Sequence, residues 1–169
     1  RPDPYFSRGV TYLLSQQFEK AIEDFTMFLR FDNKVVDAYI NRGTCYLMLK
    51  DTTRAYDDFN TAIRTNRESP SAYNRRGTLY MEQKRYDDAL ADFNKSIECD
   101  STYLPSYFNR ALAYSNLNRP VQAIEDFGRV LEIDSTSSLT YFNRAILRTQ
   151  IGDYNRALDD YDKVAFYAP

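Results

Sequence analysis

The stretch PSAYNRRGTLYMEQKRYDDALADFNKSIECDSTY, residues 70–103, recurs in altered form along the chain at intervals of 34 residues. Its tyrosine, small, alanine and aromatic positions recur in five copies. The residues in register are Tyr5, Tyr39, Tyr73, Tyr107 and Tyr141; Gly9, Gly43, Gly77, Ala111 and Ala145; Ala21, Ala55, Ala89, Ala123 and Ala157; and Phe25, Phe59, Phe93, Phe127 and Tyr161. A fixed period in this range is typical of a stacked repeat array. Such an array offers a long surface rather than a closed active-site pocket.

Each copy reads as two helices with a tight turn between them. Apolar and small residues recur at steps of three and four over residues 71–83 and again over residues 86–99, which predicts two amphipathic helices. We expect the small residue of the first helix to face the alanine of the second, where the two backbones come close. No segment alternates with period two over the length of a strand, so the prediction is an all-α fold without a sheet.

Prolines and turn-forming residues support these boundaries. Pro70 and Pro105 are predicted to open first helices and Pro120 to open a second helix, because the first helical turn does not need the missing N–H. Asn118 and Gly152 fall in the turn inside a repeat, where the chain needs a left-handed residue.

On these residues the chain resembles a tetratricopeptide repeat array over residues 2–169, with repeats at about 2–35, 36–69, 70–103, 104–137 and 138–169. The resemblance implies a right-handed α-solenoid of stacked helix–turn–helix units, forming one domain that we expect to be a fragment of a longer protein. The family's closing proline survives only as Pro169. Phe28 replaces a small residue and Arg148 replaces a tyrosine of the pattern, so we expect looser or altered packing at both places.

A charged pair repeats as regularly as the apolar positions. An arginine precedes the small residue and an aspartate precedes the aromatic residue in all five copies. These pairs are Arg8 and Asp24, Arg42 and Asp58, Arg76 and Asp92, Arg110 and Asp126, and Arg144 and Asp160. We predict an ion pair at each helix crossing, since the planar guanidinium suits a carboxylate bidentately. The alternative is that the arginines bind an anionic ligand.

Composition narrows the function classes. The net charge of −2 and the pI of about 5.2 argue against a nucleic-acid partner or an anionic membrane surface. The chain has no histidine, no phosphate loop and no cysteine pair at zinc spacing, so we expect neither catalysis nor a metal or cofactor. Cys45 and Cys99 read as buried thiols of a reducing, cytoplasmic compartment rather than as a disulfide.

The first helices of such an array are expected to line its concave face, which predicts a groove for a peptide or a helix of a partner protein. The predicted groove residues are Phe6, Ile40, Asn41, Leu47, Asn74, Arg75, Phe108, Asn109, Leu112, Phe142, Asn143 and Ile146. Asn41, Asn109 and Asn143 share one register, and an asparagine amide matches the donor and acceptor of a peptide unit. This row resembles the asparagine ladder of O-GlcNAc transferases; alternatively, these side chains bond within their own helices.

Three other functions remain open at this stage. The carboxylate-clamp domains of co-chaperones are matched at Asn41 and Arg75 but not at Phe6, Val10 and Ser71, which leaves too little positive charge. The array could instead be the targeting arm of a larger enzyme, such as a glycosyltransferase or a phosphatase. It could also self-associate through its ends into a homo-oligomer.

Overall fold

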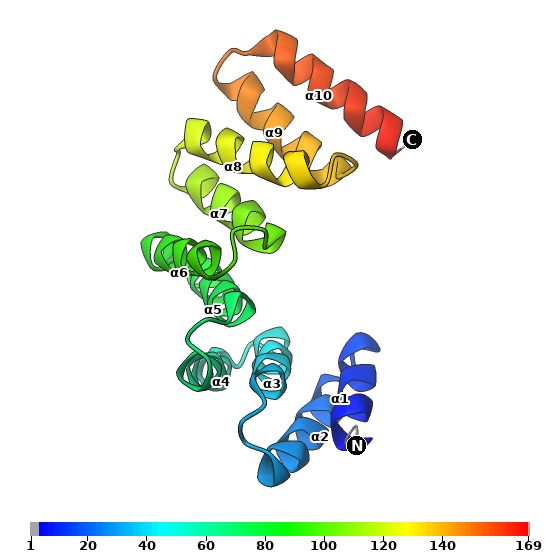
Figure 1. The fold of residues 1–169 in the computed structure, drawn as a ribbon. Coiled ribbons are helices and arrows are strands. Elements are labelled where there is room, and N and C mark those ends of the chain that lie inside the picture. The colour runs from blue at the N-terminus through cyan, green and yellow to red at the C-terminus, as the bar shows by residue number, and fades with distance from the viewer. Residues whose placement is uncertain (1–3, 169) are drawn as a thin grey trace.

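The structure is a computed structural model that describes residues 4–168, and every regular element in this range is a helix (Figure 1). The five first helices are α1 (Pro4–Leu14), α3 (Val36–Met48), α5 (Pro70–Glu82), α7 (Leu104–Asn116) and α9 (Ser138–Gln150). The five second helices are α2 (Phe18–Phe31), α4 (Thr52–Thr65), α6 (Tyr86–Cys99), α8 (Pro120–Ile133) and α10 (Tyr154–Tyr167). The prediction of an all-α solenoid is confirmed.

The helix pairs stack in chain order, with the two chain ends at opposite ends of the stack (Figure 1). Each helix packs on its neighbours in sequence, and in addition α1 touches α3, α3 touches α5 and α5 touches α7. The first helices therefore form an inner layer, in which helices of successive repeats touch one another directly. Pro70 opens α5, Pro120 opens α8 and Pro105 lies in the first turn of α7, as predicted.

The turn inside each repeat uses one left-handed residue in all five copies. Asn118 and Gly152 have φ of 55° and 80°, as the sequence predicts. The same register holds Gln16, Lys50 and Lys84, with φ of 59°, 62° and 58°. These three residue types do not usually mark a left-handed turn, so the turn geometry comes from the repeat and not from local preference.

The second helices end without the family's proline by means of a side-chain acceptor. Asp32, Asn66, Asp100 and Asp134 occupy one register, and the Oδ1 atom of each accepts the backbone N–H two residues later at 2.8–3.0 Å. Such a turn satisfies a backbone donor and redirects the chain. The repeat pattern alone did not predict this turn.

The close contact between the paired helices differs from the predicted one. The small residue faces the phenylalanine ring, not the alanine: a β carbon on Gly43 would lie 2.8 Å from Phe59 Cε1, and one on Gly77 would lie 2.6 Å from Phe93 Cε1. Both phenylalanines are fully buried. Glycine is therefore needed in these copies because the ring occupies the space of its missing side chain.

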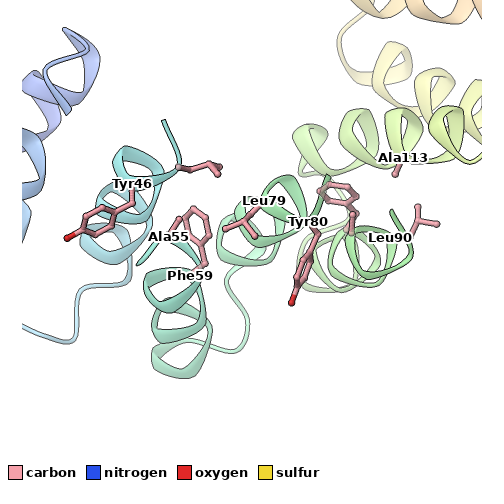
Figure 2. Close-up of a cluster of buried hydrophobic side chains, with 10 residues drawn as sticks. Tyr46, Ala55, Phe59, Leu79, Tyr80, Leu90 and Ala113 are labelled. Atoms are coloured by element: carbon pink, nitrogen blue, oxygen red, sulfur yellow. The ribbon is translucent and has the colours of Figure 1, made fainter. Parts of the chain in front are cut away.

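One hydrophobic cluster runs continuously across the central repeats (Figure 2). It joins Phe59 of α4 to Leu79 and Tyr80 of α5, and then to Leu90 of α6 and Ala113 of α7. Buried apolar surface stabilises by roughly 25 cal/mol per Å², and here each repeat supplies one wall of its neighbour's core. Single repeats could not bury these side chains alone.

Neither cysteine forms a disulfide. Cys45 is fully buried beside Phe25, which confirms its predicted position. Cys99 is only partly buried, contrary to the prediction, because it lies in the last turn of α6, where the Arg67 carbonyl 3.8 Å from its Sγ covers one side.

Candidate functional site

The arginine–aspartate pair is present in every repeat and is bidentate. In the third repeat, Arg76 Nε and Nη2 each donate to a carboxylate oxygen of Asp92 at 2.7 Å. The other four pairs have the same geometry, with distances of 2.6–3.0 Å. The five aspartate side chains are 3–8% exposed. The predicted ion pair at each helix crossing is confirmed, and these donors are not free for an anionic ligand.

The arginine also ties its repeat to the preceding one at three junctions. The Nη1 atoms of Arg42 and Arg110 donate to Thr26 Oγ1 and Asn94 Oδ1, at 3.0 and 2.6 Å; Arg76 Nη1 likewise reaches Asn60. At the fourth junction the register position is Gly128, which has no side chain to accept, so this bond is missing for Arg144.

Arg148 changes the packing of the last repeat, as expected from its departure from the family pattern. Its Nη1 donates to Asp160 Oδ2 at 2.8 Å and to the Arg156 carbonyl, so Asp160 binds two arginines. The Arg148 Nε is buried without a hydrogen-bond partner. Burial, together with the neighbouring Arg144, lowers the pKa of Arg148 below the usual arginine value. Phe28, the other departure, packs well: it is buried and its ring centroid lies 5.2 Å from that of Phe6.

The structure divides the predicted groove residues into buried and accessible groups. Ile40, Leu47 and Asn74 are only 3–5% exposed because they pack between repeats. Their role is therefore in the core, and the prediction that they line an open groove needs this correction.

The remaining predicted groove side chains stay accessible on the inner helices. Phe142 and Ile146 of α9 are 45% and 36% exposed, and Arg75 of α5 is exposed. Half-buried positions are held by Phe6, Asn41, Phe108, Asn109, Leu112 and Asn143.

The asparagine row has two oriented members. Asn109 Nδ2 donates to Asn74 Oδ1 at 3.0 Å, and Asn143 Nδ2 donates to the Leu139 carbonyl of its own helix at 2.8 Å. The side chain of Asn41 makes no hydrogen bond within residues 4–168. The intrahelical bond suggested by the alternative interpretation thus exists at Asn143, and in both oriented members the amide oxygen accepts no hydrogen bond from the described residues.

Asn109 is held by a buried polar network that the sequence analysis missed. Asn74 Oδ1 also accepts from Ser106 Oγ at 3.2 Å; Ser106 donates as well to Ser96 Oγ, and Ser96 donates to the Pro70 carbonyl. Ser96 and Ser106 are fully buried. The signal available in the sequence was that Asn74 and Ser96 stand at registers where the other copies have apolar residues.

A pocket of about 310 Å³ opens where α7, α8 and α9 meet. We call it the α7–α9 pocket; its walls include Leu104, Phe108, Asn109, Val130, Asp134 and Leu139. The first helices are farther apart here, since α7 and α9 lack a contact of the extent found between the earlier first helices. Leu139 is 59% exposed on its rim.

Models of the tetratricopeptide repeat match residues 36–69, 70–103 and 105–137, which is more than half of the chain. The chain belongs to the tetratricopeptide repeat (TPR) family. TPR arrays are protein-interaction scaffolds, so the partners of this chain are proteins. A comparison with curated proteins gave no significant match.

Solved structures with this fold share little sequence with the TPR chain. The PilF protein of Pseudomonas aeruginosa superposes with a TM-score of 0.91 at 22% identity, over 98% of this chain and 75% of that one. MamA of Desulfovibrio magneticus RS-1 gives 0.81 at 18% identity, over 96% and 92%. YrrB, described as a TPR protein with an unusual peptide-binding site, gives 0.73 at 20% identity, over 100% and 87%. At these identities the likeness shows the fold alone.

Residues 4–168 contain neither a cluster suited to a metal ion nor a helix suited to cross a membrane. No group of three or more His, Cys, Asp or Glu side chains is arranged to hold a metal ion. None of the ten helices combines the length and the apolar character needed to cross a bilayer.

Proposed function

We propose that this TPR array is a non-catalytic scaffold that binds a peptide or a helix of a partner protein along its inner helices. The observation that carries the proposal is the row formed by Asn109 and Asn143, whose amide groups are oriented by hydrogen bonds while their oxygens remain available. Oriented acceptors at one-repeat spacing can hold the backbone N–H groups of another chain, and nearby apolar side chains can take its side groups.

Surface chemistry supports an apolar rather than an anionic ligand. Phe142 and Ile146 are large exposed apolar side chains on α9, and Phe108 and Leu112 lie half-buried on α7. The arginines that could have bound an anion at the helix crossings are committed to buried aspartates. A chaperone-type carboxylate clamp is disfavoured because Arg75 is the one cation among its five stations.

The test is selection from a displayed library of random 12-residue peptides, followed by fluorescence-polarisation titration of the enriched sequences. We expect the double variant Asn109→Ala with Asn143→Ala to bind at least about tenfold more weakly, because two ligand hydrogen bonds are lost at about 1 kcal/mol each. Asn155→Ala, an exposed asparagine at the start of α10, is the control and should leave affinity unchanged. Equal affinities of all three proteins would remove the asparagine row from the mechanism.

Self-association is the second candidate, favoured by one observation on the last helix. Tyr154, Leu158 and Phe166 of α10 are 62–74% exposed, and large apolar side chains grouped on one face mark interaction surfaces. Sedimentation velocity across a hundredfold concentration range tests it: a constant monomer mass would reject self-association.

A further inference from the structure

The location of the α7–α9 pocket is occupied by different side chains at each of the four junctions between repeats. At the first junction this location is filled by Phe28, whose ring packs on Phe6. At the second it is filled by Ile40, Ala62 and Tyr73, which form one buried apolar cluster.

The third and fourth junctions are not filled by apolar side chains in this way. At the third, the buried hydrogen-bonded network of Asn74, Ser96 and Ser106 occupies the location. At the fourth, Val130 stands in the register of Phe28 and Thr140 in that of Ala38. Val130 and Thr140 are themselves buried, yet a pocket remains beside them, where the contact between α7 and α9 is smaller than those between the earlier first helices. The pocket therefore coincides with side chains that are particular to this junction.

The walls and the rim of the pocket have different chemistry. Leu104, Phe108 and Leu139 give apolar walls, and an apolar wall with few polar groups is typical of a ligand pocket. The rim carries Asn109, whose amide nitrogen donates to Asn74, while its oxygen accepts no hydrogen bond from the described part of the chain.

The second rim group is the carboxylate of Asp134. Its Oδ1 accepts from the Thr136 hydroxyl at 2.7 Å and from the Thr136 N–H at 3.0 Å. These hydrogen bonds lower the pKa of Asp134 below the usual aspartate value, so the group is ionised at neutral pH. Its Oδ2 accepts no hydrogen bond from the described part of the chain. The rim thus offers acceptors and a negative charge, and a ligand must supply donors and a positive charge.

We propose that the α7–α9 pocket takes the bulky apolar side chain of an extended peptide that carries Lys or Arg next to that residue. The apolar side chain enters between Phe108 and Leu139, the basic group meets Asp134, and a backbone N–H of the peptide donates to Asn109 Oδ1. This inference rests on the proposed function and adds to it the class of sequence that the inner face selects.

The substitution Val130→Phe tests the pocket, since it installs the residue type that closes the first junction. Val121→Phe is the matched control, because Val121 lies on the same helix, is 57% exposed and is not part of the pocket wall. Asp134→Asn tests the charge while keeping an oxygen for Thr136, and Glu125→Gln, at an exposed position on α8, controls for the lost charge. Leu139→Ser probes the same pocket from an exposed position, so a folding defect of Val130→Phe does not end the test.

The ligand is the set of peptides enriched from the random 12-residue library. We expect these peptides to share an aliphatic or aromatic residue beside Lys or Arg. Val130→Phe and Leu139→Ser should weaken binding about tenfold, the loss expected when an apolar group no longer fits its site. Asp134→Asn should weaken it about threefold, with a smaller salt dependence, while both controls stay within about twofold of the original protein.

Two results overturn the inference, and they are distinguishable. If the enriched peptides bind but lack the basic–apolar pair, or bind the pocket variants as well as the controls, the pocket is not the side-chain site although peptide binding stands. If the library yields no ligand for the original protein, the proposed function and this inference both fail.

Discussion

The arginine–aspartate pair of the third repeat gives a direct test of what holds the array together. Arg76 donates two charge-assisted hydrogen bonds of 2.7 Å to the Asp92 carboxylate, and 20% and 8% of the two side chains are exposed. Removing one partner strands the other charge away from water, whereas replacing both with apolar residues removes the desolvation cost as well as the attraction. The perturbation is therefore a double-mutant cycle with Arg76→Met and Asp92→Leu.

The expected changes in the free energy of unfolding follow from the exposure of each partner. Breaking a buried pair costs roughly 3–5 kcal/mol, and the lower end applies here because a fifth of the Arg76 side chain reaches solvent. We expect Arg76→Met to lower the free energy of unfolding by about 3 kcal/mol. Asp92→Leu should lower it by about 2 kcal/mol, since Arg76 then keeps its hydrogen bond to Asn60. The double variant should cost no more than about 2 kcal/mol, which gives a coupling free energy of about 3 kcal/mol.

The assay is equilibrium urea unfolding followed by far-ultraviolet circular dichroism, with the m-value compared among variants because repeat arrays can unfold in steps. The control cycle uses Arg85 and Asp88, an exposed pair in the same repeat with a 2.8 Å contact and 52% exposure of both side chains. Its coupling should stay within about 0.5 kcal/mol. Additive costs for Arg76→Met and Asp92→Leu, summing to about 5 kcal/mol in the double variant, would show that the two residues do not stabilise the array as a pair.

Three further predictions follow from single contacts. Gly128→Asn supplies the acceptor missing beside Arg144 and should raise the free energy of unfolding by about 1 kcal/mol, or Tm by about 2–4 °C. The site has room for a side chain, because a β carbon on Gly128 would lie at an ordinary 3.8 Å from Arg144 Nη1. An unchanged or lower Tm in a thermal scan would count against this prediction. Burial raises the pKa of Cys45 to about 12, so thiol titration at pH 8 should label Cys99 first and Cys45 only after urea is added; rapid labelling of both is the contrary outcome. Gly77→Val should lower the free energy of unfolding by about 2–3 kcal/mol, because its β carbon would lie 2.6 Å from the buried phenylalanine ring on α6. A cost below about 1 kcal/mol in urea unfolding would show that the ring moves aside without loss of packing.

Periodicity made most of the fold predictable. A spacing of 34 residues fixes which positions are equivalent, and equivalent positions such as Arg76 and Asp92 then pair identically in every copy. The positive φ of Gln16, Lys50 and Lys84 could have been inferred in the same way, by transfer from Gly152 rather than from residue preference. Repeats thus carry information that no single copy contains.

The candidate site was less predictable because it depends on distances between repeats. Register places Ile40 on the same face as Phe108, yet Ile40 is buried and Phe108 is accessible. The difference lies in the neighbouring side chains at each junction, which sequence periodicity treats as equivalent. The partner of the Asn109 amide, Asn74, likewise depends on how α5 and α7 approach.

Above all, we propose that the inner helices bind another polypeptide. The most direct measurement is a two-dimensional ¹⁵N spectrum of the labelled chain, recorded with and without a peptide enriched from the library, in which the side-chain amide signals of asparagines are resolved. Binding along the inner face predicts shifts for Asn109 and Asn143 and none for Asn155 on α10. Shifts confined to the second helices, with the Asn109 and Asn143 signals unmoved, would show that the inner face is not the binding surface.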